Sequence, residues 1–213
     1  LAGSVRADDP DGFADRHIFF PPYFIEMGHT IPTSASASVQ KEVIDVFCAG
    51  IRALGIDNGA AKGDMKFTSS GGAMVGEIAA RLSGGFMSGW TFPYSSGINL
   101  TAAALKIASG RPPGDLKPVL RKFSAERALL SIPGVVKSVE GVGEAEKMPG
   151  VMKVFLHTSP GERVVFPVNN VQKCANCISA CDEYSRAAAS AETAVRAIFI
   201  HLEPGIGATA DFL

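Results

Sequence analysis

The sequence lacks both an excess of one charge sign and a long apolar run. Its 20 Lys and Arg residues nearly balance 21 Asp and Glu residues, which gives a formal net charge of −1 at pH 7. Proteins that bind nucleic acid or an anionic membrane surface usually carry a basic patch instead. No run approaches the roughly 20 apolar residues that a membrane-spanning helix needs, and no signal peptide opens the chain. We therefore expect no nucleic-acid partner and no membrane partner.

Cysteine is scarce, and three of the four cysteines are crowded together. Cys174, Cys177 and Cys181 lie within eight positions, and only Cys48 lies apart. This spacing is poor for a disulfide framework and indicates a reducing, cytoplasmic location. The C-x2-C-x3-C pattern would suit zinc or an iron–sulfur cluster, but no fourth ligand is evident. We expect structural thiols that hold no metal, with a cysteine-ligated metal protein as the weaker alternative.

The remaining composition and patterning predict a globular α+β protein. Hydrophobic residues make up 46% and charged residues 19% of the 213 positions, which is enough for one large domain or two small ones. An apolar stripe predicts a helix over residues 38–54, with Ser38 as N-cap and Gly55 as its stop. Residues 19–31 are expected to be extended, residues 100–109 and 183–200 helical, and residues 127–132, 151–157 and 163–168 strands. Hairpins mixed with helices favour α+β over a doubly wound parallel sheet.

The Pro- and Gly-rich segment 111–114 is the best candidate for a boundary between two parts of the chain. We expect residues 1–12 to be a disordered or remnant linker. Residues 13–112 then form the larger part and residues 113–213 a small α+β part. Because Leu1 is not a natural start, we expect that an upstream part has been removed.

Residues 60–68 and 73–82 are expected to form a hairpin, because a four-residue Ser/Gly loop separates them. If Thr68 and Ala73 flank that loop, Asp64 faces Glu77 on the neighbouring strand. The same register places Lys62 opposite Ala79 and Lys66 opposite Val75.

The facing acids Asp64 and Glu77 are the strongest functional signal. Directly opposed residues share a face with β-carbons about 5 Å apart, so two carboxylates in these positions repel each other. A hard cation between them reverses the sign of that energy, and Mg2+ suits carboxylate oxygens. Arg81 is expected on the same face, two residue pairs further along. The alternative is that both acids are solvated residues of an exposed face, paired with Lys62 and Lys66.

These strands resemble the core of the ATP-grasp superfamily. Residues 59–66 read GAAKGDMK and residues 76–85 read GEIAARLSGG. Their order is similar to that of the carboxylate–amine ligases and the related carbamoyl-phosphate synthetase and glycinamide ribonucleotide synthetase branches. The resemblance extends in order over about residues 13–205. It implies a C-terminal ATP-grasp subdomain, with an antiparallel sheet and flanking helices, over residues 13–112, followed by a small α+β subdomain.

The resemblance also implies roles for individual residues. It implies metal binding by Asp64 and Glu77, catalysis by Arg81, and nucleotide binding by Lys62, Gly84 and Gly85. The cofactors it implies are ATP and Mg2+, with Mn2+ as a substitute. Three positions depart from the family pattern: Asp64 stands where Glu is usual, Lys62 where His is common, and Ala79 where an Asn commonly completes the metal shell.

Nothing upstream of Phe13 resembles the lid and the nucleotide-binding-like domain that begin such enzymes. We therefore expect a fragment or a split-gene product, inactive alone, that pairs with a missing N-terminal half. An exposed inner face would favour a homo-oligomer.

The function implied by the resemblance is ligation of a small-molecule carboxylate to an amine through an acyl-phosphate. A catalytically silent binding or assembly module is the alternative. His29 is expected to pack within the fold rather than act in catalysis, and residues 86–94 are expected to be core, with a substrate pocket as the weaker reading. The sequence does not specify which carboxylate and amine are joined.

Overall fold

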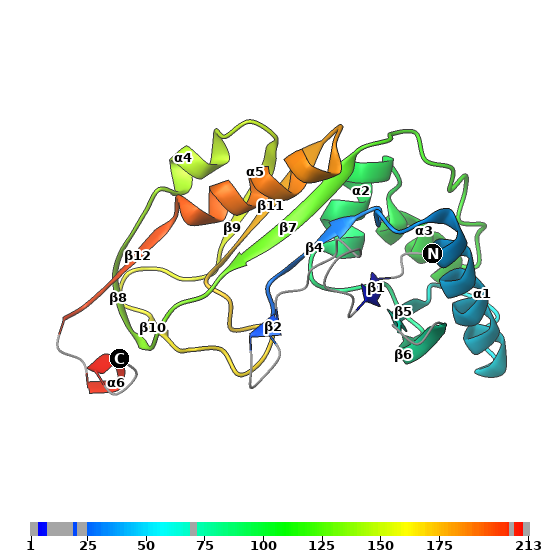
Figure 1. Cartoon of the computed structure of the whole chain (residues 1–213), viewed down its shortest axis with the longest axis horizontal. Coiled ribbons are helices and arrows are strands. Elements are labelled where there is room, and N and C mark those ends of the chain that lie inside the picture. Colours follow the sequence, from blue (N-terminus) through cyan, green and yellow to red (C-terminus); the bar gives the residue numbers. More distant parts are fainter. Residues whose placement is uncertain (1–3, 8–18, 21–24, 69–71, 205–206, 211–213) are drawn as a thin grey trace. The chain divides into compact units, whose positions relative to one another are not determined.

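The computed structural model describes residues 4–7, 19–20, 25–68, 72–204 and 207–210 (Figure 1). The chain divides into two compact units, and each is described by itself. Unit 1 contains residues 1–16 and 30–123, and unit 2 contains residues 17–29 and 124–213. This division falls about ten residues later than the Pro- and Gly-rich segment at 111–114, and it adds an N-terminal stretch to the second unit. None of the described helices is long and apolar enough to cross a membrane.

Unit 1 is built on a three-stranded sheet of order β1-β5-β6. Strand β1 (Ser4–Ala7) runs parallel to β5 (Lys62–Phe67), and β5 runs antiparallel to β6 (Ala73–Ala79). The strand at Ser4–Ala7 corrects the expectation of a disordered or remnant linker for these four residues, because β5 pairs with their backbone. The rest of residues 1–12 lies outside the described residues.

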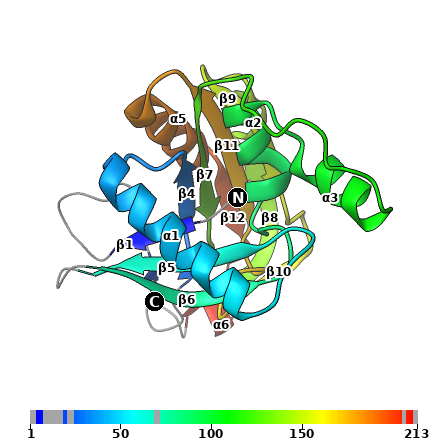
Figure 2. The same cartoon turned by 90° about the vertical axis from the view of Figure 1, so that its right-hand side faces the viewer.

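Helix α1 (Ala37–Ala53) covers one face of this sheet (Figure 2). Val43 and Phe47 from the helix pack with Met65 from β5, and each of the three is at most 4% exposed. The N-cap is Ser36, whose side chain accepts a hydrogen bond from the Val39 amide, so the choice of Ser38 was wrong. In a run of alternating serines, the residue with extended backbone takes the capping role.

After β6 the chain forms the π-helix η1 (Met87–Thr91), α2 (Phe92–Ser96) and α3 (Leu100–Ala108). The expected helix at 100–109 is confirmed, and the Asn99 side chain caps it by accepting from the Ala102 amide at 2.9 Å. The π-helix and α2 were not expected, because the Gly and Pro residues in this stretch indicate turns.

Unit 2 contains the four-stranded sheet β4-β7-β11-β9. Its strands are β4 (Gly28–Ile31), β7 (Phe123–Leu129), β11 (Ala175–Cys181) and β9 (Val151–Leu156). Helices α4 (Val142–Glu146) and α5 (Tyr184–Arg196) cover one face, as Figure 1 shows. Their alanines and valines form a core with Val154, Ala175 and Cys177.

A second sheet of order β10-β8-β12 completes unit 2, with a short β2-β3 pair and helix α6 (Gly207–Ala210). Its strands are β10 (Arg163–Val164), β8 (Gly134–Glu140) and β12 (Phe199–Leu202); the short pair is β2 (Phe19–Phe20) and β3 (Ile25–Glu26). The expected final helix ends at Arg196, and residues 199–200 belong to a strand instead. The α+β prediction, with antiparallel sheets and flanking helices, is confirmed.

The three crowded cysteines belong to strand β11 and its approach, and their side chains enter different surroundings. Cys174 packs with Val136 and Val164, whereas Cys177 lies in the core formed with α5. Cys181 is half-buried, with its sulfur 3.8 Å from Ser190 Oγ. Burial, and secondarily the nearby Glu126 carboxylate, raises the pKa of Cys177 to about 12. Among the described residues, no group of three or more His, Cys, Asp or Glu is arranged to hold a metal ion.

We predict that Gly141→Ala lowers the free energy of unfolding by at least about 2 kcal/mol. Gly141 precedes α4 with φ +82°, and a β-carbon there would lie 1.8 Å from the Ala197 carbonyl oxygen. The matched control is Gly143→Ala, inside α4, where a β-carbon meets nothing within 4 Å; it should gain about 0.5–1 kcal/mol. Urea unfolding measures both, and equal effects would contradict the steric argument.

We also predict that the Cys177 thiol resists thiol reagents in the native protein at pH 8. A pKa of about 12 leaves a thiolate fraction on the order of 10⁻⁴. Since the unfolded thiol ionises near pH 8.5, the free energy of unfolding should fall as pH rises above about 9. Mass spectrometry after labelling measures the protection, with the half-buried Cys48 as the internal comparison. Labelling of Cys177 as fast as Cys48 would show that the core around β11 opens readily.

Candidate functional site

The β5-β6 hairpin brings Asp64 directly opposite Glu77, as the sequence predicts. Lys62 lies opposite Ala79, also as predicted, but Lys66 pairs with Met74 and not with Val75. The register shifts between Asp64 and Met65, where a β-bulge takes up one extra residue of β6. A bulge cannot be seen from loop length, because it depends on how the two strands twist against their neighbours.

The Lys62 ammonium lies between the two acids. Its Nζ is 2.6 Å from Asp64 Oδ2 and 3.1 Å from Glu77 Oε1. The Lys62 side chain is 11% exposed, compared with 25% for Asp64 and 55% for Glu77. We call these three residues the Lys62 cluster. The repulsion expected between the facing carboxylates is therefore relieved by a cation from the same strand.

The donor atoms of the Lys62 cluster can be compared with those that a Mg2+ ion requires. Asp64 and Glu77 each present an oxygen to one point, since both contact a single nitrogen atom. Two converging carboxylates are suitable Mg2+ donors. That point is held by the Lys62 ammonium, however, and Ala79 offers no third ligand. The donor set fits Mg2+ only if the ammonium moves aside and other oxygen ligands, such as phosphates, complete the shell.

Arg81 lies beyond the end of β6 and not on its face. The strand ends at Ala79, whose carbonyl accepts a hydrogen bond from the Arg81 amide. The exposed Arg81 guanidinium donates to the Leu82 carbonyl at 2.9 Å. The expectation that strand alternation places Arg81 beside Asp64 and Glu77 was wrong, because the backbone bends before the next residue pair.

Gly84 and Gly85 begin a tight turn that leads into the π-helix. The Met87 amide donates to the Gly84 carbonyl, and both central residues have positive φ, +59° at Gly85 and +66° at Phe86. Phe86 therefore holds a left-handed conformation that costs a bulky residue on the order of 1–3 kcal/mol. Strained residues and π-helices recur at functional sites, so this turn adds a structural signal beside the Lys62 cluster.

His29 is a buried residue of unit 2, 3% exposed, with its Nδ1 3.5 Å from Glu126 Oε2. Glu126 is 2% exposed and accepts a short hydrogen bond from the Asn176 amide. The Asn176 side-chain oxygen lies 2.9 Å from Nε2 of His157. These contacts support packing for His29. Glu126 was missed, although an acid within the strand-like residues 123–129 was a usable signal.

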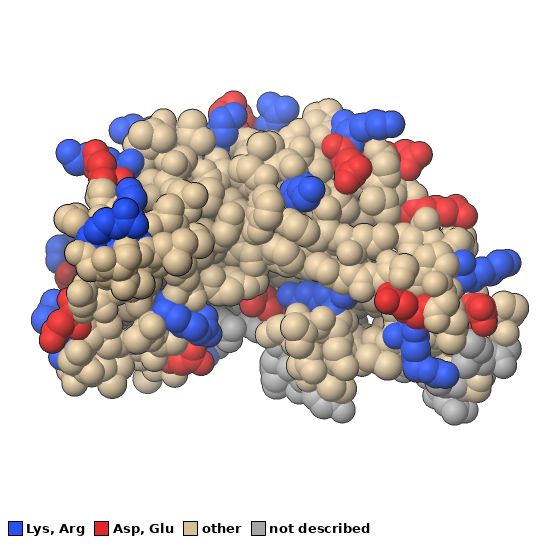
Figure 3. Space-filling model, turned by 180° about the vertical axis from the view of Figure 1, so that it is seen from behind, with Lys and Arg blue, Asp and Glu red and all other residues tan. Residues whose placement is uncertain are grey.

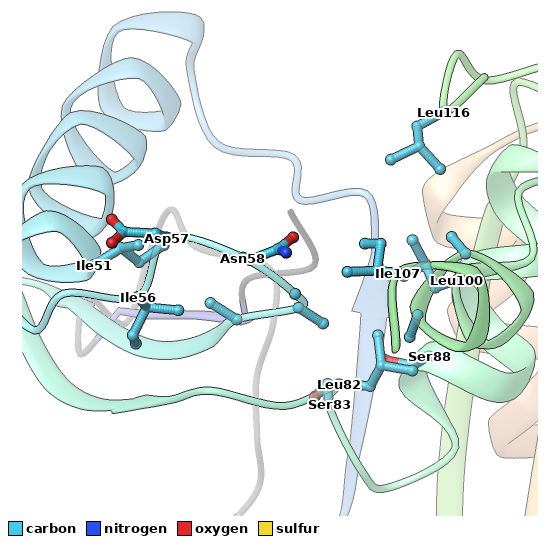
Figure 4. A pocket seen from close by; sticks show the side chains of 15 residues that line it. Ile51, Ile56, Asp57, Asn58, Leu82, Ser83, Ser88, Leu100, Ile107 and Leu116 are labelled. Atoms are coloured by element: carbon cyan, nitrogen blue, oxygen red, sulfur yellow. The ribbon is translucent and has the colours of Figure 1, made fainter. Parts of the chain in front are cut away.

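A pocket of about 200 Å³ lies in unit 1, between the loop that precedes β5 and helix α3 (Figure 4). Of residues 86–94, which were expected to be core or to line a substrate pocket, only Ser88 lines this pocket.

On the face of the molecule in Figure 3, Lys and Arg side chains are interspersed with Asp and Glu. That face shows no field of one charge sign.

We predict that Lys62→Met lowers the free energy of unfolding by about 1–2 kcal/mol, because it leaves two facing carboxylates without their cation. Millimolar Mg2+ should raise the melting temperature of this variant more than that of the unmodified protein. The control is Lys41→Met, which removes an ion pair to Asp45 with both side chains more than half exposed. Equal melting temperatures for the two variants, with no response to Mg2+, would contradict the assignment.

Comparison with known proteins identifies one matching family and several structures with a similar fold. Residues 127–203 match the family described as L-amino acid ligase C-terminal domain 2. An uncharacterized protein of Sinorhizobium fredii, y4rH, is 24% identical over 161 residues, which are 76% of this chain and 33% of that protein.

Solved structures share the fold at low sequence identity. The L-amino acid ligase of Bacillus licheniformis has a TM-score of 0.74 at 19% identity and covers 85% of this chain and 45% of its own. The phosphoribosylglycinamide synthetase of Anaerococcus prevotii has a TM-score of 0.78 at 15% identity and covers 90% and 49%.

A third structure is the biotin carboxylase domain of Hydrogenobacter thermophilus 2-oxoglutarate carboxylase, in complex with Mg-ADP and bicarbonate. Its TM-score is 0.62 at 12% identity, over 83% of this chain and 39% of its own. This chain thus spans between a third and a half of the proteins it matches. Residues 127–203 match a domain of the L-amino acid ligases, and the chain shares its fold with parts of the L-amino acid ligase and phosphoribosylglycinamide synthetase structures.

Proposed function

We propose that this chain is the C-terminal part of an ATP- and Mg2+-dependent ligase that joins a carboxylate to an amine. The observation that carries the proposal is the Lys62 cluster, in which two carboxylates and one ammonium converge at a single point of the hairpin. A site of this kind can neutralise phosphates and hold a cation at once. Because the matched ligases are about twice as long as this chain, the activity is proposed for the whole protein.

In the proposed reaction, a substrate carboxylate oxygen attacks the γ-phosphorus of ATP, and ADP leaves with the electrons of the broken P–O bond. The resulting acyl-phosphate is attacked at its acyl carbon by the amine nitrogen. The new C–N bond forms, phosphate leaves, and the nitrogen loses one proton. Little of this requires covalent help from the protein, so its contribution is to position the reactants and neutralise charge.

Each residue of the Lys62 cluster has a part in this proposal. Asp64 and Glu77 would hold Mg2+, which supplies charge neutralisation to the phosphates when bound. Lys62 would then turn from the two acids towards a phosphate oxygen, since its ammonium is a point charge on a flexible stem. The exposed Arg81 guanidinium would contact the transferring phosphoryl group or the substrate carboxylate. Gly84 and Gly85 would let the backbone approach the anionic intermediate.

The test of the function is a substrate screen of the full-length protein with Mg-ATP, following ADP release and the mass of the product. We expect ADP only when both a carboxylate and an amine are present, together with a product lighter than the two substrates by one water. Glu77→Gln should abolish it. ADP release that needs no carboxylate, or a phosphorylated amine as product, would contradict a carboxylate–amine ligase.

We predict that Arg81→Ala in the full-length enzyme lowers turnover by roughly 10²–10³-fold while the KM for ATP changes little. The lost charge contact is made mainly in the transition state, and the side chain is exposed, so the fold should be unaffected. Arg52→Ala, an exposed arginine at the end of α1, is the control and should keep full turnover. Unchanged turnover in Arg81→Ala would remove Arg81 from the site.

A further inference from the structure

The pocket of about 200 Å³ in unit 1 is a separate feature from the Lys62 cluster, none of whose members lines it. Its walls come from Ile51 at the end of α1, residues 56–61, residues 82–83, Ser88, helix α3 and Leu116. In Figure 4, Asn58 faces Leu100 and Ile107 of α3 across the opening. The volume of the pocket is far larger than the ~30 Å³ that one water molecule occupies in the liquid, and it is smaller than that of most sites for drug-sized ligands.

Most of the pocket wall is aliphatic. Ile56, Leu82, Leu100 and Ile107 line it together with several alanines. Leu116, at the rim, keeps 42% of its surface exposed. Covering such a surface with an apolar ligand is favourable by about 25 cal/mol per Å².

Ser88 is the exception within this wall. It is 3% exposed, and its hydroxyl has no hydrogen-bond partner among the described protein atoms. The hydroxyls of the same helical segment behave differently. Ser95 and Ser96 both donate to the Phe92 carbonyl, at 3.0 and 2.7 Å. A buried hydroxyl without a partner costs about 1–3 kcal/mol, so Ser88 is placed to receive a polar group from a molecule inside the pocket.

The charges around the pocket restrict the ligand further. None of the lining residues is Lys, Arg or His, and the one acid, Asp57, is exposed. A carboxylate or phosphate would lose its hydration here without gaining a cation, which makes anion binding unfavourable. The nucleotide and the carboxylate of the proposed reaction are therefore excluded as occupants.

We propose that this pocket binds a small, uncharged, mainly aliphatic molecule that carries one hydroxyl or carbonyl group, with Ser88 Oγ as its hydrogen-bond partner. The inference rests on the pocket and on Ser88, and it stands whether or not the protein is a ligase. Two of the lining residues, Ala61 and Leu82, are the sequence neighbours of Lys62 and Arg81. An occupant would thus contact both segments that lead to the candidate site.

Binding is tested on the 213-residue chain by calorimetric titration with 1-hexanol and, separately, with hexanoate. We expect a Kd for hexanol on the order of 1 mM and a Kd for hexanoate at least about tenfold weaker. Ser88→Ala should weaken hexanol about fivefold, and Ala104→Phe, which fills the space from the partly exposed face of α3, should abolish binding. Equal affinity for the alcohol and the carboxylate would overturn the proposal.

The matched control is Ser95→Ala, the same substitution at a buried serine that does not line the pocket. It should leave the hexanol Kd within about twofold but lower the melting temperature, because its hydrogen bond is lost. Ser88→Ala should keep or raise the melting temperature, since no hydrogen bond to protein is removed. A melting temperature that falls equally in both variants, or a hexanol Kd unchanged in Ser88→Ala, would show that Ser88 does not serve the pocket.

Discussion

The arrangement of the hairpin depends on one electrostatic constraint: two carboxylates face each other across β5 and β6, and something positive must lie between them. Here the Lys62 ammonium contacts both Asp64 and Glu77. Lys62 lies on the same strand face as Asp64, two residues away, so the cation is supplied by strand alternation itself. The ammonium thus relieves the repulsion between the two carboxylates, and in the proposed function it would turn away from them towards a phosphate.

Unit 2 also contains a carboxylate that needs polar partners, and this one is buried in the interior. Glu126 lies in the middle of a sheet with almost no solvent exposure, where an unpaired carboxylate would be costly. Asn176 and His29 contact its two oxygens, and His157 extends the chain of polar contacts to the surface. Each of the four strands thus contributes one polar side chain, three from within β4, β7 and β11 and one from just beyond β9. A buried polar network of this kind favours one order of the strands, because another order would leave the Glu126 carboxylate without Asn176 and His29.

Much of this fold follows from local pattern. Three features depend only on residues that are close together in the sequence: the apolar stripe of α1, the Asn99 cap of α3 and the alanines of α5. The segments that the patterns missed include β8 and β11, which lie centrally in their sheets, and the π-helix with α2. The sequence of β11 shows no alternation of apolar and polar residues, because both faces of the strand are covered. Its positions hold small and apolar residues together with the hydrogen-bonded Asn176. Cys174 and Cys177 are buried in two different clusters of apolar side chains, and Cys181 is half-buried at the end of the strand.

For the candidate site, the sequence pattern predicted the facing pair Asp64 and Glu77, although the register it assumed beside the turn is one residue off. Phe67 pairs with Ala73, and the bulge between Asp64 and Met65 restores the Asp64–Glu77 pairing. The sequence by itself determined the family resemblance, because a spaced set of acids and glycines is a property of the chain order. Only the tertiary structure decided that Lys62 bridges the pair, that a bulge displaces Lys66, and that the strand ends before Arg81. These depend on side-chain direction and backbone bending, which neighbours distant in sequence set. The Ser88 pocket belongs to the same class, because its walls come from segments that only folding brings together.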